Sequence, residues 1–155
     1  MMALGAYPRL RRLKREGRLD VIDAHFAFPD GYAATLLGRW LQVPVTITLR
    51  GTETRHVEDK KLGPLLLAAL SRATRVFAVS ESLKTLVVGR GADAGKIEVV
   101  GNGVDISRFS PVDRLAARAA LGLPAVAAIL VSVGGVVPLK TLHRVTEELP
   151  DLDYR

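Results

Sequence analysis

The chain has 155 residues, of which 48% are hydrophobic and 25% are charged, and this composition excludes wholesale disorder, collagen-like repeats and a coiled coil. Cysteine is absent, so disulfide frameworks, thiolate-ligated zinc, iron–sulfur clusters and thiol catalysis are excluded together. The net charge of +6 belongs to the start of the chain: residues 1–18 hold six basic side chains and one acid, whereas the remainder holds 16 basic and 15 acidic residues.

An uncharged stretch from Ala119 to Leu139 is long enough to raise the question of a membrane-spanning helix. Glycine and proline interrupt it, among them Pro124 and Pro138, so we interpret it as short elements joined by turns. The first seven residues are apolar, but the basic residues follow them instead of preceding them. We therefore predict no secretory signal.

Helical and extended patterns alternate along the sequence. Apolar side chains at helical spacing indicate helices, and short apolar or β-branched runs between turn residues indicate strands. Asp30 and Ser80 each precede a helical pattern and are candidate N-caps. In chain order we expect a basic helix that ends near residue 17, a strand over 20–26, a helix over 32–41, a strand over 43–49, a helix over 64–73, a strand over 75–79, a helix over 81–88, and strands over 97–100 and 128–133.

The segment Gly89–Gly95 matches the GxGxxA spacing of dinucleotide-binding sites. A fingerprint of that kind follows a strand and opens a helix, whereas this segment closes a helix and precedes a strand. We interpret it as a helix C-cap and a turn.

Alternating strands and helices with apolar strands predict the α/β class, with a Rossmann-like, doubly wound parallel sheet. In such sheets, ligands bind outside the carboxyl ends of the strands. The segments that follow the predicted strands are therefore the ones in which functional side chains are expected: residues 25–31, 50–53, 80–82 and 101–105.

Five segments carry a resemblance to a known family: DVIDAHFAFPDG, VPVTITLRGTE, ATRVFAVSESL, KIEVVGNGVDISRFSP and ILVSVGGVVPLK. In this order and spacing they resemble the retaining glycosyltransferases of family 4, which have the two-domain GT-B fold. The resemblance begins near residue 19. It implies an enzyme that moves a sugar from a nucleotide-diphosphate donor to a glycan or lipid-linked acceptor with retention. It also implies no cofactor and no metal, with the reaction in the cleft between the two domains.

The resemblance assigns residues 1–110 to a partial N-terminal, acceptor-side domain and residues 111–155 to the start of a C-terminal, donor-side domain. The paired glutamates of the family's donor domain have no counterpart here, and the family's opening glycine-rich loop would precede Met1. We therefore expect the chain to be an internal fragment of a longer enzyme. Two alternatives stay open: a catalytically inactive remnant of such an enzyme, and a small α/β module that binds nucleotides or polyanions.

Two residues are assigned to the catalytic site. His25 stands where the family places a histidine near the acceptor, and a neutral imidazole can accept a proton from a sugar hydroxyl or orient it. Arg50 stands where many members have a histidine; arginine is no base at neutral pH, but it binds phosphate or carboxylate, so we expect an anionic acceptor or a diphosphate there. The alternatives are a histidine bonded to a loop backbone and a surface ion pair of Arg50 with Glu53 or Glu58.

The remaining site predictions follow from the other family segments. The residues expected to bind substrate are Asp30, Gly31, Gly51, Thr52, Asn102 and Gly103, with Asp30 and Gly31 in the acceptor pocket and Asn102 and Gly103 at the mouth of the cleft. A plain hinge turn is the alternative for Asn102 and Gly103. Gly134, Gly135 and Lys140 are expected to bind the donor diphosphate, because glycines let backbone N–H groups approach phosphates and lysine supplies a compensating charge. Many members have arginine in place of Gly135 and glycine in place of Thr141, so part of the usual phosphate clamp is missing. An ordinary strand-to-helix turn is the structural alternative.

The basic segment Arg9–Arg18 has three interpretations: a solvated helix face, contact with anionic lipid head groups, and non-specific attraction to nucleic acid. No aromatic residue lies among its basic side chains, which disfavours nucleic acid, and we expect no specific nucleic-acid partner. We expect a cytoplasmic protein, with peripheral contact with the inner membrane face as the alternative for this segment.

Overall fold

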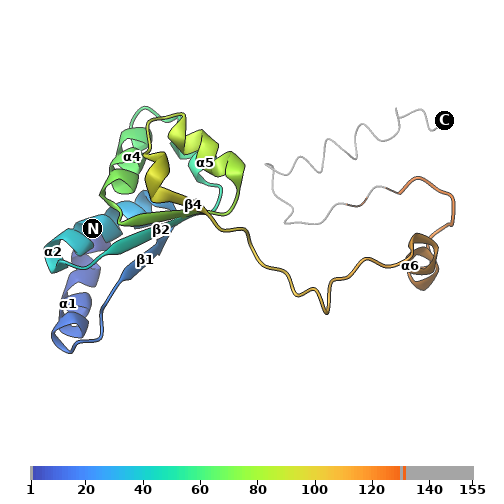
Figure 1. The fold of residues 1–155 in the computed structure, drawn as a ribbon, viewed down its shortest axis with the longest axis horizontal. Helices are drawn as coiled ribbons and strands as arrows, with labels where there is room; N and C mark the ends of the chain where they lie inside the picture. Colours follow the sequence, from blue (N-terminus) through green and yellow to red (C-terminus); the bar gives the residue numbers. More distant parts are fainter. Residues whose placement is uncertain (1, 130, 132–155) are drawn as a thin grey trace. The chain divides into compact units, whose positions relative to one another are not determined.

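The computed structural model describes residues 2–129 and 131 (Figure 1). The chain divides after Gly103 into two units, Met1–Gly103 and Val104–Arg155, and each is described by itself.

A parallel sheet forms the centre of the first unit, with its four strands in the order β1-β2-β3-β4. The strand register pairs Ala24 with Ile47, Ile47 with Val76, and Val76 with Ile97. The strands are β1 (Ile22–His25), β2 (Val45–Leu49), β3 (Arg75–Ala78) and β4 (Ile97–Val99). This architecture confirms the predicted α/β class and the parallel, Rossmann-like sheet.

Helical segments connect the strands, as parallel pairing requires. Figure 1 shows α4 and α5 on the same side of the sheet. The helical segments are α1 (Met2–Arg15), η1 (Ala27–Gly31), α2 (Tyr32–Leu41), α3 (Glu53–His56), α4 (Leu62–Arg72), α5 (Glu81–Val88) and η2 (Ala94–Lys96).

One apolar core joins η1, α2, α4 and α5 to one face of the sheet. Strand residues Ile47 and Val76 are fully buried, as are Leu66 of α4 and Val87 of α5. Side chains at the alternate strand positions point to the opposite face, because successive residues of a strand alternate. They are exposed or half-buried, and they are Asp23, His25, Thr46, Thr48, Arg75, Phe77 and Glu98.

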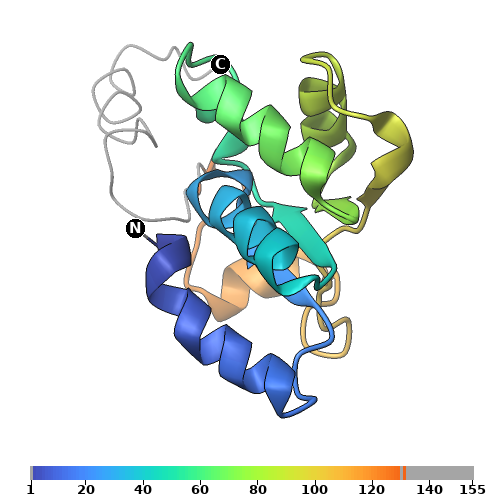
Figure 2. The ribbon, with the colours of Figure 1, turned by 90° about the vertical axis from the view of Figure 1, so that its left-hand side faces the viewer.

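Helix α1 is longer than the sequence predicts, because it begins at Met2 and runs through Pro8. It lies beside α2 (Figure 2), where the ring of Tyr7 meets the ring of Trp40 edge-on at a centroid distance of 5.9 Å. The Lys14 ammonium donates to the backbone carbonyls of Leu41 and Gln42 at the end of α2. Tertiary packing on α2 therefore stabilises a helix that is longer than local propensity predicts.

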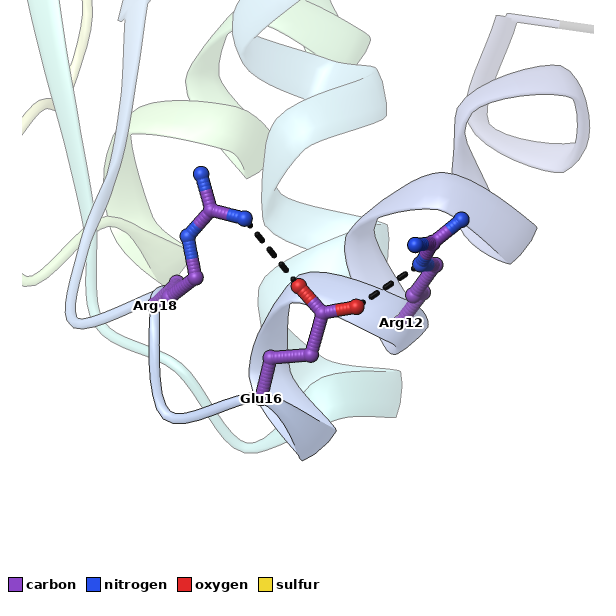
Figure 3. A network of polar contacts seen from close by, with 3 residues as sticks. All are labelled: Arg12, Glu16 and Arg18. Atoms are coloured by element: carbon purple, nitrogen blue, oxygen red, sulfur yellow. Dashed lines mark hydrogen bonds and ion pairs between the residues drawn. The ribbon is translucent and has the colours of Figure 1, made fainter.

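The carboxylate of Glu16 joins two of the basic side chains near the end of α1 (Figure 3). Its oxygens lie 2.7 Å from Arg12 Nε and 3.2 Å from a guanidinium nitrogen of Arg18. The basic charge of this segment is therefore partly compensated on the molecule itself.

The two predicted N-caps have different outcomes. Ser80 caps α5, since its hydroxyl accepts a hydrogen bond from the Leu83 amide at 3.3 Å. Asp30 is not an N-cap: helix α2 begins after Gly31, which is itself in a helical conformation, and no side chain caps it. The Tyr32 amide at the start of α2 donates to the backbone carbonyls of Ala27 and Pro29 in η1, so it is not left for a capping carboxylate.

The described part of the second unit contains helix α6 (Arg114–Ala120). The Asp113 carboxylate caps it by accepting from the Leu115 and Ala116 amides. Only residues 128, 129 and 131 of the strand predicted over 128–133 are described, and none of them is in a strand. Across the described residues, no helix is long and apolar enough to cross a membrane.

Candidate functional site

Parallel pairing brings several predicted site residues to one edge of the sheet. His25 ends β1, the segment Arg50–Thr52 follows β2, and Asn102 and Gly103 follow β4. The carboxyl ends of parallel strands lie at the same edge, which is where such sheets bind ligands. The topology therefore places these segments at the same edge of the sheet, with those after β1 and β2 on neighbouring strands and Asn102 and Gly103 after the outermost strand β4.

His25 has a carboxylate next to it that the sequence reading missed. Its Nε2 lies 3.2 Å from the Asp23 carboxylate, and both side chains are about half exposed. The other oxygen of that carboxylate accepts a hydrogen bond from the Thr46 hydroxyl on the adjacent strand. The Asp23 carboxylate lies beside Nε2, so Nδ1 is the ring nitrogen that has no neighbouring carboxylate within the described residues. The signal was the Asp-x-His spacing, which places both side chains on one face of a strand.

A pocket of about 420 Å³ lies beside these side chains. Its polar groups come from Asp23, His25 and Asp30, and part of its apolar wall comes from Ala6 of α1 and Leu37 of α2. Two carboxylates and an imidazole can hydrogen-bond a polyhydroxylated ligand, and apolar walls of this kind are usual in small-molecule sites.

The segment after β1 has an unusual backbone. Phe26 adopts φ +73°, which is rare for a bulky side chain, and the Phe28–Pro29 peptide bond is cis. Phe26 is held from both sides: its amide donates to the Thr48 carbonyl and its carbonyl accepts from the Gly31 amide, each at 2.9 Å. Gly31 is buried beneath this turn, so packing alone explains the glycine.

The segment after β2 presents Arg50 to solvent. Gly51 has φ +121°, a conformation that glycine adopts without strain, and Thr52 is exposed. The alternative ion pair of Arg50 with Glu53 or Glu58 is not formed: Glu58 pairs with Arg90 at 2.8 Å, and the Glu53 carboxylate accepts from backbone amides. Within the described residues the Arg50 guanidinium makes no hydrogen bond or ion pair.

Glu53 is the second functional candidate that the sequence reading missed. Its side chain is 1% exposed, and its carboxylate accepts three backbone hydrogen bonds. They come from the Ala27 amide at 3.0 Å, the Arg50 amide at 3.2 Å and the Gly51 amide at 2.8 Å. Glu53 therefore links the segment after β1 to the segment after β2.

The other predicted site residues differ in how far the structure describes them. Asn102 and Gly103 are exposed, and Gly103 has neither a positive φ nor a close neighbour that would require glycine. Gly134, Gly135 and Lys140 lie outside the described residues. Among the described residues no group of three or more histidine or acidic side chains could hold a metal ion.

Comparison with known proteins identifies the family. The model of glycosyltransferase family 4 matches residues 2–108. A D-inositol 3-phosphate glycosyltransferase from Mycolicibacterium gilvum is 52% identical over 151 residues, covering 88% of this chain and 34% of the relative. One from Kribbella flavida is 31% identical over 164 residues, covering 95% of this chain and 38% of the relative. The chain thus spans about a third of the length of these relatives. It belongs to glycosyltransferase family 4.

Proposed function

We propose that this chain contributes the acceptor-binding part of an enzyme that transfers a sugar from a nucleotide-diphosphate donor with retention of configuration. The observation that carries the proposal is the placement of His25 and Arg50 at the ends of adjacent parallel strands. His25 lines a pocket with the carboxylates of Asp23 and Asp30, and Arg50 has no ion-pair partner within the described residues. The imidazole Nδ1 suits a hydroxyl that loses its proton during transfer. The exposed guanidinium suits an anion on the same acceptor.

The acceptor proposed here is a phosphorylated polyol of the inositol phosphate type. The relatives are named for D-inositol 3-phosphate, and Arg50 offers a bidentate partner for a phosphate. The wider sequence expectation of a glycan or lipid-linked acceptor remains the second candidate. The two candidate acceptors are distinguished by one property: an inositol phosphate should bind without an attached lipid, whereas a lipid-linked acceptor should require it.

Calorimetry with D-inositol 3-phosphate and with unphosphorylated inositol tests the acceptor. Replacement of Arg50 by alanine should weaken binding of the phosphate by about tenfold to a hundredfold, the range for a charge-assisted hydrogen bond. Arg55→Ala is the matched control, because Arg55 is also exposed and lies on α3. Equal affinities for the two ligands, or equal losses in the two variants, would contradict the proposal.

Donor binding is proposed for Gly134, Gly135 and Lys140, with no cofactor and no metal. Calorimetry with UDP and GDP tests it: micromolar binding that weakens on Lys140→Ala supports a working donor site. Absence of binding favours the catalytically inactive remnant. Affinity for polyanions that falls steeply with salt and survives Lys140→Ala favours the small nucleotide- or polyanion-binding module.

Peripheral contact with an anionic membrane surface is proposed for the segment Arg9–Arg18, in a cytoplasmic enzyme. Helix α1 supports it, since Arg9, Arg11 and Arg15 are exposed together with Leu4, which is 69% exposed. Sedimentation with vesicles tests it: phosphatidylglycerol vesicles should bind the chain and phosphatidylcholine vesicles should not. Binding to neither kind of vesicle would leave the helix as a solvated face, and equal binding to both would contradict an attraction to anionic lipid.

A further inference from the structure

We propose that Glu53 is a positioning residue that fixes the relative placement of the two segments that carry the acceptor-binding side chains. The inference rests on the proposed function for the ligand, and on the three hydrogen bonds of one buried carboxylate for the geometry. Glu53 does not touch the acceptor in this account. It acts through the backbone from which Arg50 and His25 extend.

The carboxylate is placed to act on both segments at once. One oxygen accepts from the Ala27 amide, two residues after His25, and the other accepts from the Arg50 and Gly51 amides. Ala27 is 26 residues from Glu53 in the sequence, so its hydrogen bond is long-range. Arg50 and Gly51 are three and two residues from Glu53, so their hydrogen bonds are local. One buried side chain therefore connects the segment that follows β1 to the segment that follows β2.

The buried carboxylate of Glu53 depends on its hydrogen bonds for a favourable free energy. A buried carboxylate is unfavourable unless its charge is compensated, and hydrogen bonds to an ionised group are stronger than neutral ones. Here the compensation in the described structure is entirely from backbone N–H groups, with no cation in contact. Backbone donors cannot move without moving the segment to which they belong, so the charge fixes the main chain itself.

The rest of α3 acts on the same segment. The ring of His56 meets the ring of Phe28 edge-on, at a centroid distance of 6.2 Å. Its Nδ1 is buried without a hydrogen-bond partner in the described structure, so this imidazole contributes by packing. Helix α3 thus holds the segment Ala27–Gly31 through Glu53 and His56 together. Phe26, whose positive φ is unfavourable, lies directly before the amide that Glu53 binds.

Two substitutions separate the local bonds from the long-range one. Glu53→Gln keeps the length of the side chain but turns an amide N–H₂ toward amide donors, so it loses at least one bond. Glu53→Asp is shorter by one methylene; it can still accept from Gly51, two residues away, but no longer reaches Ala27. Glu58→Gln is the matched control, since Glu58 is an exposed acid that pairs only with Arg90 in the described structure.

Amide hydrogen exchange in the intact 155-residue chain measures the geometry, and calorimetry with D-inositol 3-phosphate measures its consequence. We expect exchange of the Ala27 amide to accelerate by about tenfold or more in Glu53→Asp while exchange of the Gly51 amide stays at the wild-type rate. In Glu53→Gln we expect exchange to accelerate for at least one of these two amides, because glutamine keeps a single acceptor oxygen. We expect acceptor affinity to fall several-fold in both variants while thermal unfolding stays cooperative. Glu58→Gln should change neither quantity.

The outcomes distinguish this inference from the proposed function. Unchanged Ala27 exchange in both variants, or wild-type acceptor affinity together with a loss in Arg50→Ala, overturns the positioning role and leaves the proposed function standing. Accelerated Ala27 exchange in a chain whose wild type binds no inositol phosphate supports the positioning role and contradicts the proposed acceptor. Loss of cooperative folding in both variants overturns the inference, because Glu53 would then be needed for the fold itself.

Discussion

The absence of a side chain at Gly31 lets η1 and the start of α2 lie close to β2. A Cβ at this position would stand 2.9 Å from Ile47 Cδ1 and 2.9 Å from the Phe26 carbonyl oxygen, and the second of these is backbone that cannot rotate away. We therefore predict that Gly31→Ala lowers the free energy of unfolding by about 1–3 kcal/mol, the range for overpacking. Urea denaturation measures it.

Gly5→Ala is the control for that prediction. A Cβ at Gly5 meets no atom within 4 Å, and the residue lies inside α1, so alanine should leave stability unchanged or raise it slightly. If both variants have the stability of the wild type, the close approach at Gly31 is wrong.

At the residue scale, the sequence predicts the residues that reach solvent and misses those that act through the main chain. Strand ends in a parallel sheet point to the segments that contain His25 and Arg50, and the resemblance to the family assigns these two residues within them. For Glu53 the sequence predicts a place in the segment after the second strand and, as an alternative, a surface ion pair with Arg50, but no structural role. Its true partners are backbone amides, one of them 26 residues away, and no side-chain pattern encodes such a contact.

At the element scale, helix α5 depends on the hydroxyl of Ser80, which accepts from the Leu83 amide. Ser80→Ala should lower the free energy of unfolding by about 1 kcal/mol, since it leaves a first-turn amide without its partner. Urea denaturation at constant slope measures it, with Ser71→Ala on α4 as the control for a serine whose hydroxyl makes no hydrogen bond within the described residues. A loss as large in Ser71→Ala would contradict the capping role.

The Asp59 carboxyl, just before α4, should make the free energy of unfolding depend on pH. Backbone hydrogen bonds from Leu62 and Lys61 hold the pKa of the Asp59 carboxyl below its ordinary value of 3.8. A depressed folded-state pKa means that this stabilisation is present above the unfolded-state pKa and is lost as the pH falls through the folded-state pKa.

Comparison of the wild type with Asp59→Asn isolates that contribution, since asparagine keeps an acceptor oxygen but does not ionise. We expect the wild type to be the more stable of the two in urea at about pH 6, and the difference to shrink by about pH 3. A difference that is constant or grows toward acid would contradict the assigned cause.

Element prediction succeeds where the pattern is local and fails where tertiary contacts decide. The helix over 32–41 and the Ser80-capped helix were found with the bounds that the structure shows. Helix α1 extends through Pro8 because Tyr7 packs on Trp40, and η1 replaces a simple turn because Glu53 and Phe26 fix its backbone. Both outcomes depend on residues far away in sequence.

At the scale of the whole molecule, the alternation of elements was sufficient to predict a parallel sheet, and the sheet was sufficient to place the candidate site at its carboxyl edge. The domain boundary near residue 110 stays a prediction, although the chain divides into units after Gly103. The one-sided core was not predicted. It leaves His25 and Asp23 together on the open face of the sheet, where a ligand can reach them.

The most direct test of the central claim, that the carboxyl edge of this sheet binds a phosphorylated acceptor, is amide chemical-shift mapping during titration with D-inositol 3-phosphate. We expect the shifted amides to cluster at residues 25–31 and 50–53. Shifts confined to α1, or to the amino ends of the strands near Val45 and Arg75, would contradict it.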